Sequence, residues 1–226
     1  KGIKIANNGS IYITGYTSGD YFIRSAFGGY GSTDTFIGKF NSDGEQDWIR
    51  LLGSEQYKHT RSQAIEIGSD GAVYITGYTD GNLGGDTNSG SDDAFISKFS
   101  SDGVNQWTKL LGTNGNEIGF GITTANDGSI YITGYTEGDL DGETNTGSND
   151  VFVTKFKSNG EKQWTKLLGS SKSDRGYGIT TANDGYIYIT GYSTGDLNGL
   201  TNSGSDDIFI SKLNSDGEQQ WTKLLG

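Results

Sequence analysis

The sequence predicts an all-β fold, a β-propeller built from four-stranded antiparallel blades, with four blades in this chain. The first observation is a seven-residue motif that recurs four times, at 11–17, 73–79, 130–136 and 187–193. The second is a tryptophan after each copy, and these tryptophans are spaced 59, 57 and 57 residues apart: Trp48, Trp107, Trp164 and Trp221. A fixed period of this length is the signature of a repeat architecture.

The elements of one repeat follow in order, shown here for the third copy. Residues 121–125 are a short candidate strand, and the Asn-Asp-Gly at 126–128 predicts a hairpin turn. Residues 130–136 alternate β-branched and aromatic side chains, as strands do. A polar loop covers 137–149, a third strand 150–156, a second turn 158–160 and a fourth strand 163–168. No stretch has a convincing helical period of apolar residues.

Four strands of this length form a sheet that is too small to bury both of its faces alone. Radial stacking of such sheets solves this problem and gives a propeller. We therefore expect one domain over 1–226, with blades at approximately 1–53, 54–112, 113–169 and 170–226. Two arrangements are compatible with the sequence: a closed ring of four blades, or an arc of a larger ring completed by further blades or by a second copy.

Composition limits the function classes. The chain has 226 residues, a net charge of −11, 38 glycines and no cysteine, methionine or proline. An acidic chain without a basic stripe argues against nucleic acid as a partner, and no apolar run is long enough to predict a membrane span. Without cysteine there is no disulfide and no thiolate chemistry. The sequence does not begin with Met, so we expect a processed form or part of a longer protein, with any signal peptide removed.

The repeat also resembles a known family. The run from Asp207 to Gly226, and the run from Asn183 to Tyr192, are similar to the bacterial beta-propeller repeat, known as the SBBP repeat. All four copies share this resemblance, so it covers essentially the whole chain. It implies a propeller scaffold at a bacterial extracytoplasmic location, secreted or at the cell surface, and it implies almost nothing about the ligand.

Strand order predicts which loops share a face. The tight Asx-Gly turns lie on one face of the propeller, and the long loops and the crossovers between blades lie on the other. Binding residues concentrate on such loops. Blade 1 departs from the other blades here, because its long loop and its following crossover are both longer. These two segments hold the candidate partner-binding residues: Tyr21, Phe22, Arg24, Phe27, Tyr30, Tyr57, Lys58, His59 and Arg61. Aromatic residues and Arg are enriched in binding hot spots; an end blade packed against a missing neighbour would explain the same departure.

The polar loop of blade 3 partly resembles a calcium loop. Its oxygen-bearing residues alternate as hard cations require, and they are the candidate metal ligands: Asp139, Asp141, Glu143, Asn145 and Asp150. However, Thr144 stands where such a loop needs glycine, and the acidic positions change between blades. We therefore favour a turn scaffold made by local side-chain hydrogen bonds, with no cofactor expected and calcium as the alternative. The recurring Asp and Lys at strand ends predict hydrogen bonds between blades.

These observations predict a non-catalytic binding or adhesion module that contacts a protein or glycan through its long-loop face. One alternative is a carbohydrate-binding lectin with one site in the polar loop of each blade. A second alternative is a glycan-active enzyme, which would need a carboxylate pair that the sequence does not nominate.

Overall fold

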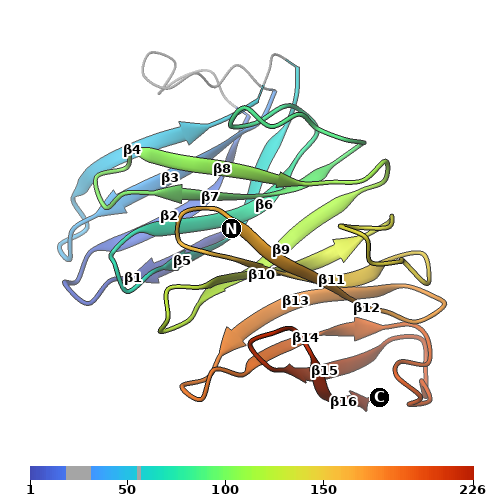
Figure 1. Cartoon of the computed structure of the whole chain (residues 1–226). Coiled ribbons are helices and arrows are strands. Elements are labelled where there is room, and N and C mark those ends of the chain that lie inside the picture. The colour runs from blue at the N-terminus through green and yellow to red at the C-terminus, as the bar shows by residue number, and fades with distance from the viewer. Residues whose placement is uncertain (19–31, 55–56) are drawn as a thin grey trace.

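The computed structural model describes residues 1–18, 32–54 and 57–226. Within them the chain forms four antiparallel sheets of four strands each, arranged in sequence order (Figure 1). We call these sheets blades 1 to 4. The all-β propeller architecture predicted from the sequence is confirmed.

The blades have nearly the same strand lengths. Blade 1 contains β1 (Gly2–Ile5), β2 (Ile11–Thr17), β3 (Asp34–Phe40) and β4 (Gln46–Leu52). Blade 2 contains β5 (Thr60–Ile67), β6 (Val73–Thr79), β7 (Asp93–Phe99) and β8 (Asn105–Leu111). Blade 3 contains β9 (Glu117–Thr124), β10 (Ile130–Thr136), β11 (Asp150–Phe156) and β12 (Lys162–Leu168). Blade 4 contains β13 (Asp174–Thr181), β14 (Ile187–Ser193), β15 (Asp207–Leu213) and β16 (Gln219–Leu225).

The predicted hairpin turns are present in every blade. Their glycines adopt the positive φ that Asx-Gly turns require, from 76° to 86°: Gly9, Gly44, Gly71, Gly103, Gly128, Gly160, Gly185 and Gly217. The first strand is the one element whose predicted bounds were wrong. We expected 121–125 in blade 3, but β9 begins four residues earlier, at Glu117.

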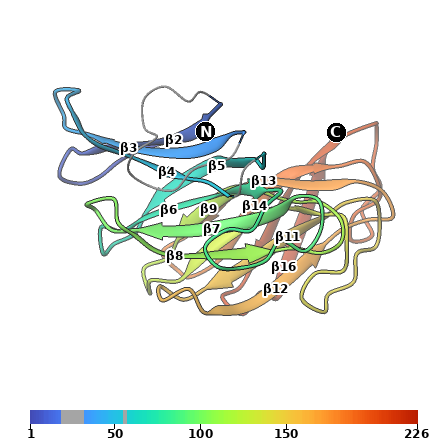
Figure 2. The same cartoon turned by 90° about the horizontal axis from the view of Figure 1, so that it is seen from above.

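The hydrophobic core lies between the blades. Three apolar clusters are buried, each built from the facing sides of two consecutive blades. Between blades 2 and 3, for example, Tyr74, Ala94 and Ile96 pack against Ile122 and Ile132. Figures 1 and 2 show blade 1 and blade 4 at opposite ends of this stack. In the described parts of the chain, extended strand packing joins only blades that are adjacent in sequence.

Candidate functional site

The long loop of blade 1 and the crossover after it are the two segments in which the sequence predicts a binding site. Five of the predicted partner-binding residues lie outside the described residues: Tyr21, Phe22, Arg24, Phe27 and Tyr30. The described end of that loop meets the crossover after blade 1, because Thr33 pairs with His59 in an isolated β-bridge. The described end of the loop and the crossover therefore lie on one face, as strand order predicts.

The four described candidates in the crossover and at the start of β5 have different environments. Tyr57 is 78% exposed and has a φ of 70°, and Lys58 is exposed. The amide of His59 donates to Asp80 Oδ1 at 2.5 Å, which ties the crossover to the end of β6. Of these four residues, only Arg61 belongs to a larger cluster of aromatic rings.

Arg61 lies among tyrosines from two blades. Its guanidinium stands 5.3 Å from the ring centre of Tyr16. Its Nη1 donates to the Tyr78 hydroxyl at 3.2 Å, and this hydrogen bond raises the pKa of Arg61 further. Lys1 Nζ lies 4.9 Å from the same Tyr16 ring. Cation–π contacts of this kind hold a cation and a ring in fixed positions.

The row of aromatic rings continues across blades 3 and 4. Phe120 lies 4.9 Å from Tyr177 and 6.0 Å from Tyr135, measured between ring centres. Tyr177 lies 5.8 Å from Tyr192. Arg175 stands 4.4 Å from the Tyr135 ring. We call the whole set the axial cluster: Tyr16, Arg61, Tyr78, Phe120, Tyr135, Arg175, Tyr177 and Tyr192.

The position of the cluster follows from the elements that carry it. Its tyrosines at the ends of the second strands lead into the long loops, and its arginines stand second in the first strands, next to the crossovers. First strands of consecutive blades pack on each other, so they line the propeller axis. The cluster is therefore the axial part of the long-loop face.

A β-bulge brings the rings of the first strands to this surface. Pairing between β9 and β10 passes from Gly121 opposite Thr133 to Gly119 opposite Gly134, which leaves Phe120 unpaired. The same shift leaves Tyr177 unpaired in blade 4 and Gln63 in blade 2. A bulge re-aims the side chain of its extra residue. Phe120 and Tyr177 thus leave the sheet and reach each other across the blades.

Charges of both signs surround the rings. The Nε atoms of Arg61 and Arg175 are buried and have no hydrogen-bond partner in the described structure. Burial, and after it the charge of Asp80, raise the pKa of Asp92, although Arg61 opposes them. Glu137 accepts from the Asn116 side chain at 2.7 Å. The surface therefore offers aromatic faces, guanidinium donors and carboxylate acceptors side by side.

The five candidate metal ligands are not brought together. Asp139 accepts from the Asn145 amide at 2.9 Å and closes the loop. Asp141 is bonded to Lys162, and Glu143 Oε1 to Lys166 at 2.7 Å. The Asn145 side chain donates to a carbonyl of β10, and Asp150 accepts from the Thr146 amide. No group of three acidic, His or Cys side chains in the described part of the chain is placed to hold a metal ion.

A shallow hollow of about 390 Å³ lies beside the polar loop of blade 2. It is lined by loop residues and by one cation from blade 3, among them Asp86, Thr87, Ser89, Asp141 and Lys162. Polar side chains dominate it, and no aromatic ring contributes.

Most of the axial cluster was missed by sequence reasoning, which named Arg61 alone. The tyrosines at 16, 78, 135 and 192 recur once per blade at the end of the motif strand, and that recurrence beside the long-loop face was a usable signal. Phe120 fell outside the first strand predicted for blade 3, because that strand was predicted too short; Arg175 and Tyr177 lie in the equivalent strand of blade 4. Only the observed register shows that they reach the axis.

The fold places the chain in the class of repeat proteins that are built from propeller blades. Comparison with known proteins specifies the repeat: residues 106–141 and 163–198 match the model of the beta-propeller repeat, SBBP. The chain thus contains repeats of this family, and the resemblance deduced from the sequence is confirmed.

Individual relatives add little beyond the fold. Regulatory protein FlaEY of Caulobacter vibrioides is 30% identical over 68% of this chain and 18% of its own length. An uncharacterized WD repeat-containing protein L264 of Acanthamoeba polyphaga mimivirus is 29% identical over 59% of this chain and 13% of its own. The chain thus spans less than a fifth of either relative.

Solved structures are similar at low identity. One is a protein of unknown function from Bacteroides caccae, 11% identical, with a TM-score of 0.47 over 99% of this chain and 80% of that one. Another is a gluconolactonase from Xanthomonas campestris, 12% identical, with a TM-score of 0.45 over 85% of this chain and 58% of that one. The described part of the chain contains no helix long and apolar enough to cross a bilayer.

Proposed function

We propose that the chain is a non-catalytic binding module that holds a glycan or protein partner on the axial part of its long-loop face. The observation that supports this is the row of rings and guanidinium groups that runs over four blades. Aromatic residues and Arg supply the largest share of binding energy in protein interfaces. Propeller scaffolds place such a row on a rigid frame, which lowers the ordering cost of binding.

A glycan is the partner that this surface suits best. Sugar rings present one apolar face of C–H groups, which packs on aromatic rings, and an edge of hydroxyls that need donors and acceptors. Tyr16 and Tyr177 are exposed rings of the cluster. The arginines and carboxylates beside them supply both kinds of hydrogen-bonding group. A protein partner would use the same rings as anchors.

A glycan array, run beside a protein panel, tests the proposal. We expect specific binding that Tyr177→Ala lowers about tenfold or more, since an aromatic anchor that the partner buries contributes about 2 kcal/mol. Tyr186→Ala is the control, because this ring lies in the opposite, hairpin-turn region of the same blade. Tyr57→Ala tests the blade 1 crossover separately. If the axial cluster is the site, this variant should bind as the wild type does. Equal binding by the wild type and the Tyr177 variant would contradict the axial site.

The second candidate is a lectin with one site per polar loop, and the hollow beside the blade 2 loop favours it. Here Thr87→Ala would remove the blade 2 site and lower the number of glycan sites per chain, whereas Tyr177→Ala would leave binding unchanged. Running the array with and without a calcium chelator tests the calcium alternative at the same time. The secreted or cell-surface location stays a prediction that fractionation of the source cells would test.

A further inference from the structure

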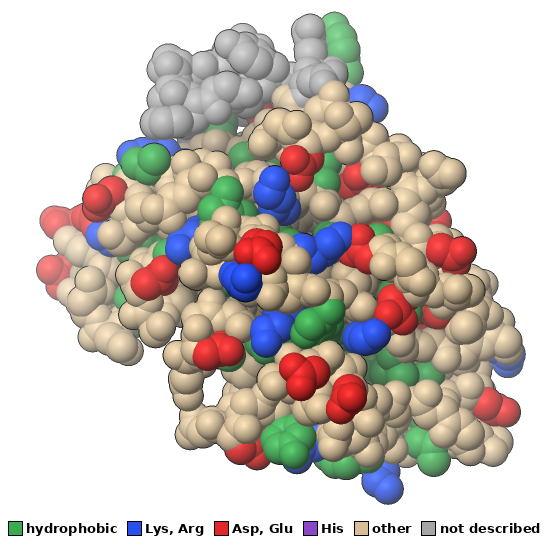
Figure 3. Space-filling view, in the orientation of Figure 1, with side chains coloured by type: hydrophobic (Ala, Val, Ile, Leu, Met, Phe, Trp, Pro, Cys, Tyr) green, Lys and Arg blue, Asp and Glu red, His purple; other side chains and the backbone are tan. Residues whose placement is uncertain are grey.

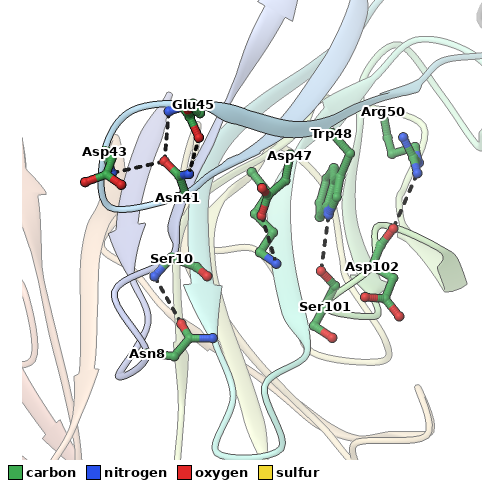
Figure 4. A network of polar contacts seen from close by, with 11 residues as sticks. Asn8, Ser10, Asn41, Asp43, Glu45, Asp47, Trp48, Arg50, Ser101 and Asp102 are labelled. Atoms are coloured by element: carbon green, nitrogen blue, oxygen red, sulfur yellow. Dashed lines mark hydrogen bonds and ion pairs between the residues drawn. The ribbon is translucent and has the colours of Figure 1, made fainter.

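The blades are joined by one repeated contact. In each of three joints, the tryptophan of the fourth strand donates from Nε1 to a serine carbonyl in the last turn of the next blade. The distances are 3.3 Å from Trp48 to Ser101, 3.2 Å from Trp107 to Ser158 and 3.3 Å from Trp164 to Ser215. Figure 4 shows the first of these, with Arg50 reaching the carbonyl of Asp102 beside it.

The apolar part of each joint is equally regular. We call the side of a blade that packs on the next blade its trailing face, and the side that receives the previous blade its leading face. Ala94 and Val151 stand at one equivalent position on the trailing faces of blades 2 and 3 and are fully buried; in blade 1 the position is taken by the buried polar residue Thr35. Burial of this kind stabilises a joint by roughly 25 cal/mol for each Å² of apolar surface.

The trailing face of blade 4 is also apolar at this position, but it is exposed. Ile208 stands at the position of Val151 and is 58% exposed. Trp221 is 37% exposed, and its indole N–H has no acceptor among the described residues. Its ring lies against that of Tyr188 in its own blade, at 6.2 Å between centres.

The leading face of blade 1 is the matching surface, and it is open too. Ile3 is 63% exposed, whereas its equivalents Ile65 and Ile122 are buried. A methyl group built on Gly103 would lie 3.0 Å from the ring of Trp48, but the space beside its equivalent Gly44 is empty. The turn of blade 1 therefore has a free place where a tryptophan ring packs in every other blade.

We propose that two copies of this chain associate head to tail, with the trailing face of blade 4 of each copy on the leading face of blade 1 of the other. Trp221 then donates to the Ser42 carbonyl of the second copy and packs beside its Gly44, which continues the internal joint unchanged. The contact is heterologous, and two such joints close a ring of eight blades. The proposal does not depend on the proposed function.

The mass of the chain in solution tests this inference directly. Sedimentation at concentrations up to roughly 100 µM should give twice the mass of one chain. Ile3→Asp and Trp221→Asp each remove one of the two faces and should raise the dissociation constant about tenfold or more. Val104→Asp is the matched control, since Val104 is 62% exposed and lies away from both end faces. If Trp221→Asp does not fold, Ile208→Asp replaces it.

Mixing the two face variants identifies the geometry. Each retains one intact face, so the mixture should recover a dimer with a single joint, which neither variant forms alone. A wild type with the mass of one chain overturns the proposal, and so does a dimer that Ile3→Asp leaves unchanged. A series of larger open assemblies would overturn the closed ring of two copies.

Discussion

Asp93 shows what a recurring charged residue does in this fold. It is fully buried at the start of β7 and accepts from the Ser89 amide at 2.9 Å, so it holds the polar loop of its own blade. Asp150 holds Thr146 in the same way. The sequence led us to expect contacts between blades from the recurring aspartates, and for Asp93 and Asp150 that expectation was wrong. The recurring lysines do cross between blades: Lys98 donates to Ser158 and Lys155 to Ser215.

Asp93 should make stability depend on pH. Burial raises the pKa of Asp93 from 3.8 to about 6. The folded state therefore binds a proton more tightly than the unfolded state, and the free energy of unfolding falls as the pH rises from about 4 to about 6. Asp93→Asn keeps an acceptor for Ser89 and removes this titration. Urea unfolding at several pH values should show the variant gaining stability over the wild type across that window. Parallel pH profiles would contradict the assignment.

At the scale of the element, the bulge in the first strand requires a glycine opposite it in the second strand. A methyl group on Gly134 would overlap the carbonyl oxygen of Ile118. Gly77 and Gly191 face backbone carbonyls of β5 and β13 in the same way. Gly15 of blade 1 differs, because its nearest neighbour is the flexible ring of Phe36.

Substituting these glycines should therefore have unequal costs. Gly134→Ala should lower the free energy of unfolding by about 1–3 kcal/mol, because the backbone must shift to admit the methyl group. Gly15→Ala, at the same motif position, should cost less, since only a side chain has to move. Denaturant unfolding of both variants measures the difference. Equal losses would show that the bulge does not impose the glycine.

The same element shows what the sequence could predict. The second, third and fourth strands of blade 3 were predicted to within one residue, because their alternation and Asx-Gly turns are strong local signals. The first strand was predicted only in part, because Gly119 and Gly121 weaken its local β-propensity. Tertiary contacts decide how this strand pairs with β10, and that pairing sets the position of Phe120. The fold could thus be predicted from local sequence patterns, whereas most residues of the axial cluster could not.

At the scale of the whole molecule, the repeats make a stack whose ends are unlike its interior. The positively and negatively charged side chains are distributed over the face seen in Figure 3, with no large patch of one sign. Aromatic residues of the axial cluster come from all four blades, so the surface exists only when the blades are stacked. A second copy placed on the end faces would extend the same row, since Tyr16 and Tyr192 stand in the two end blades.

Amide hydrogen exchange of the chain, with and without a ligand found on the array, tests the central claim most directly. The account predicts slower exchange at the starts of the first strands, residues 61–63, 118–120 and 175–177, where the axial cluster is built. The polar loops at 82–92, 139–149 and 196–206 should exchange as before. Protection confined to those loops, with the axial strands unchanged, would contradict the account and favour one site per blade.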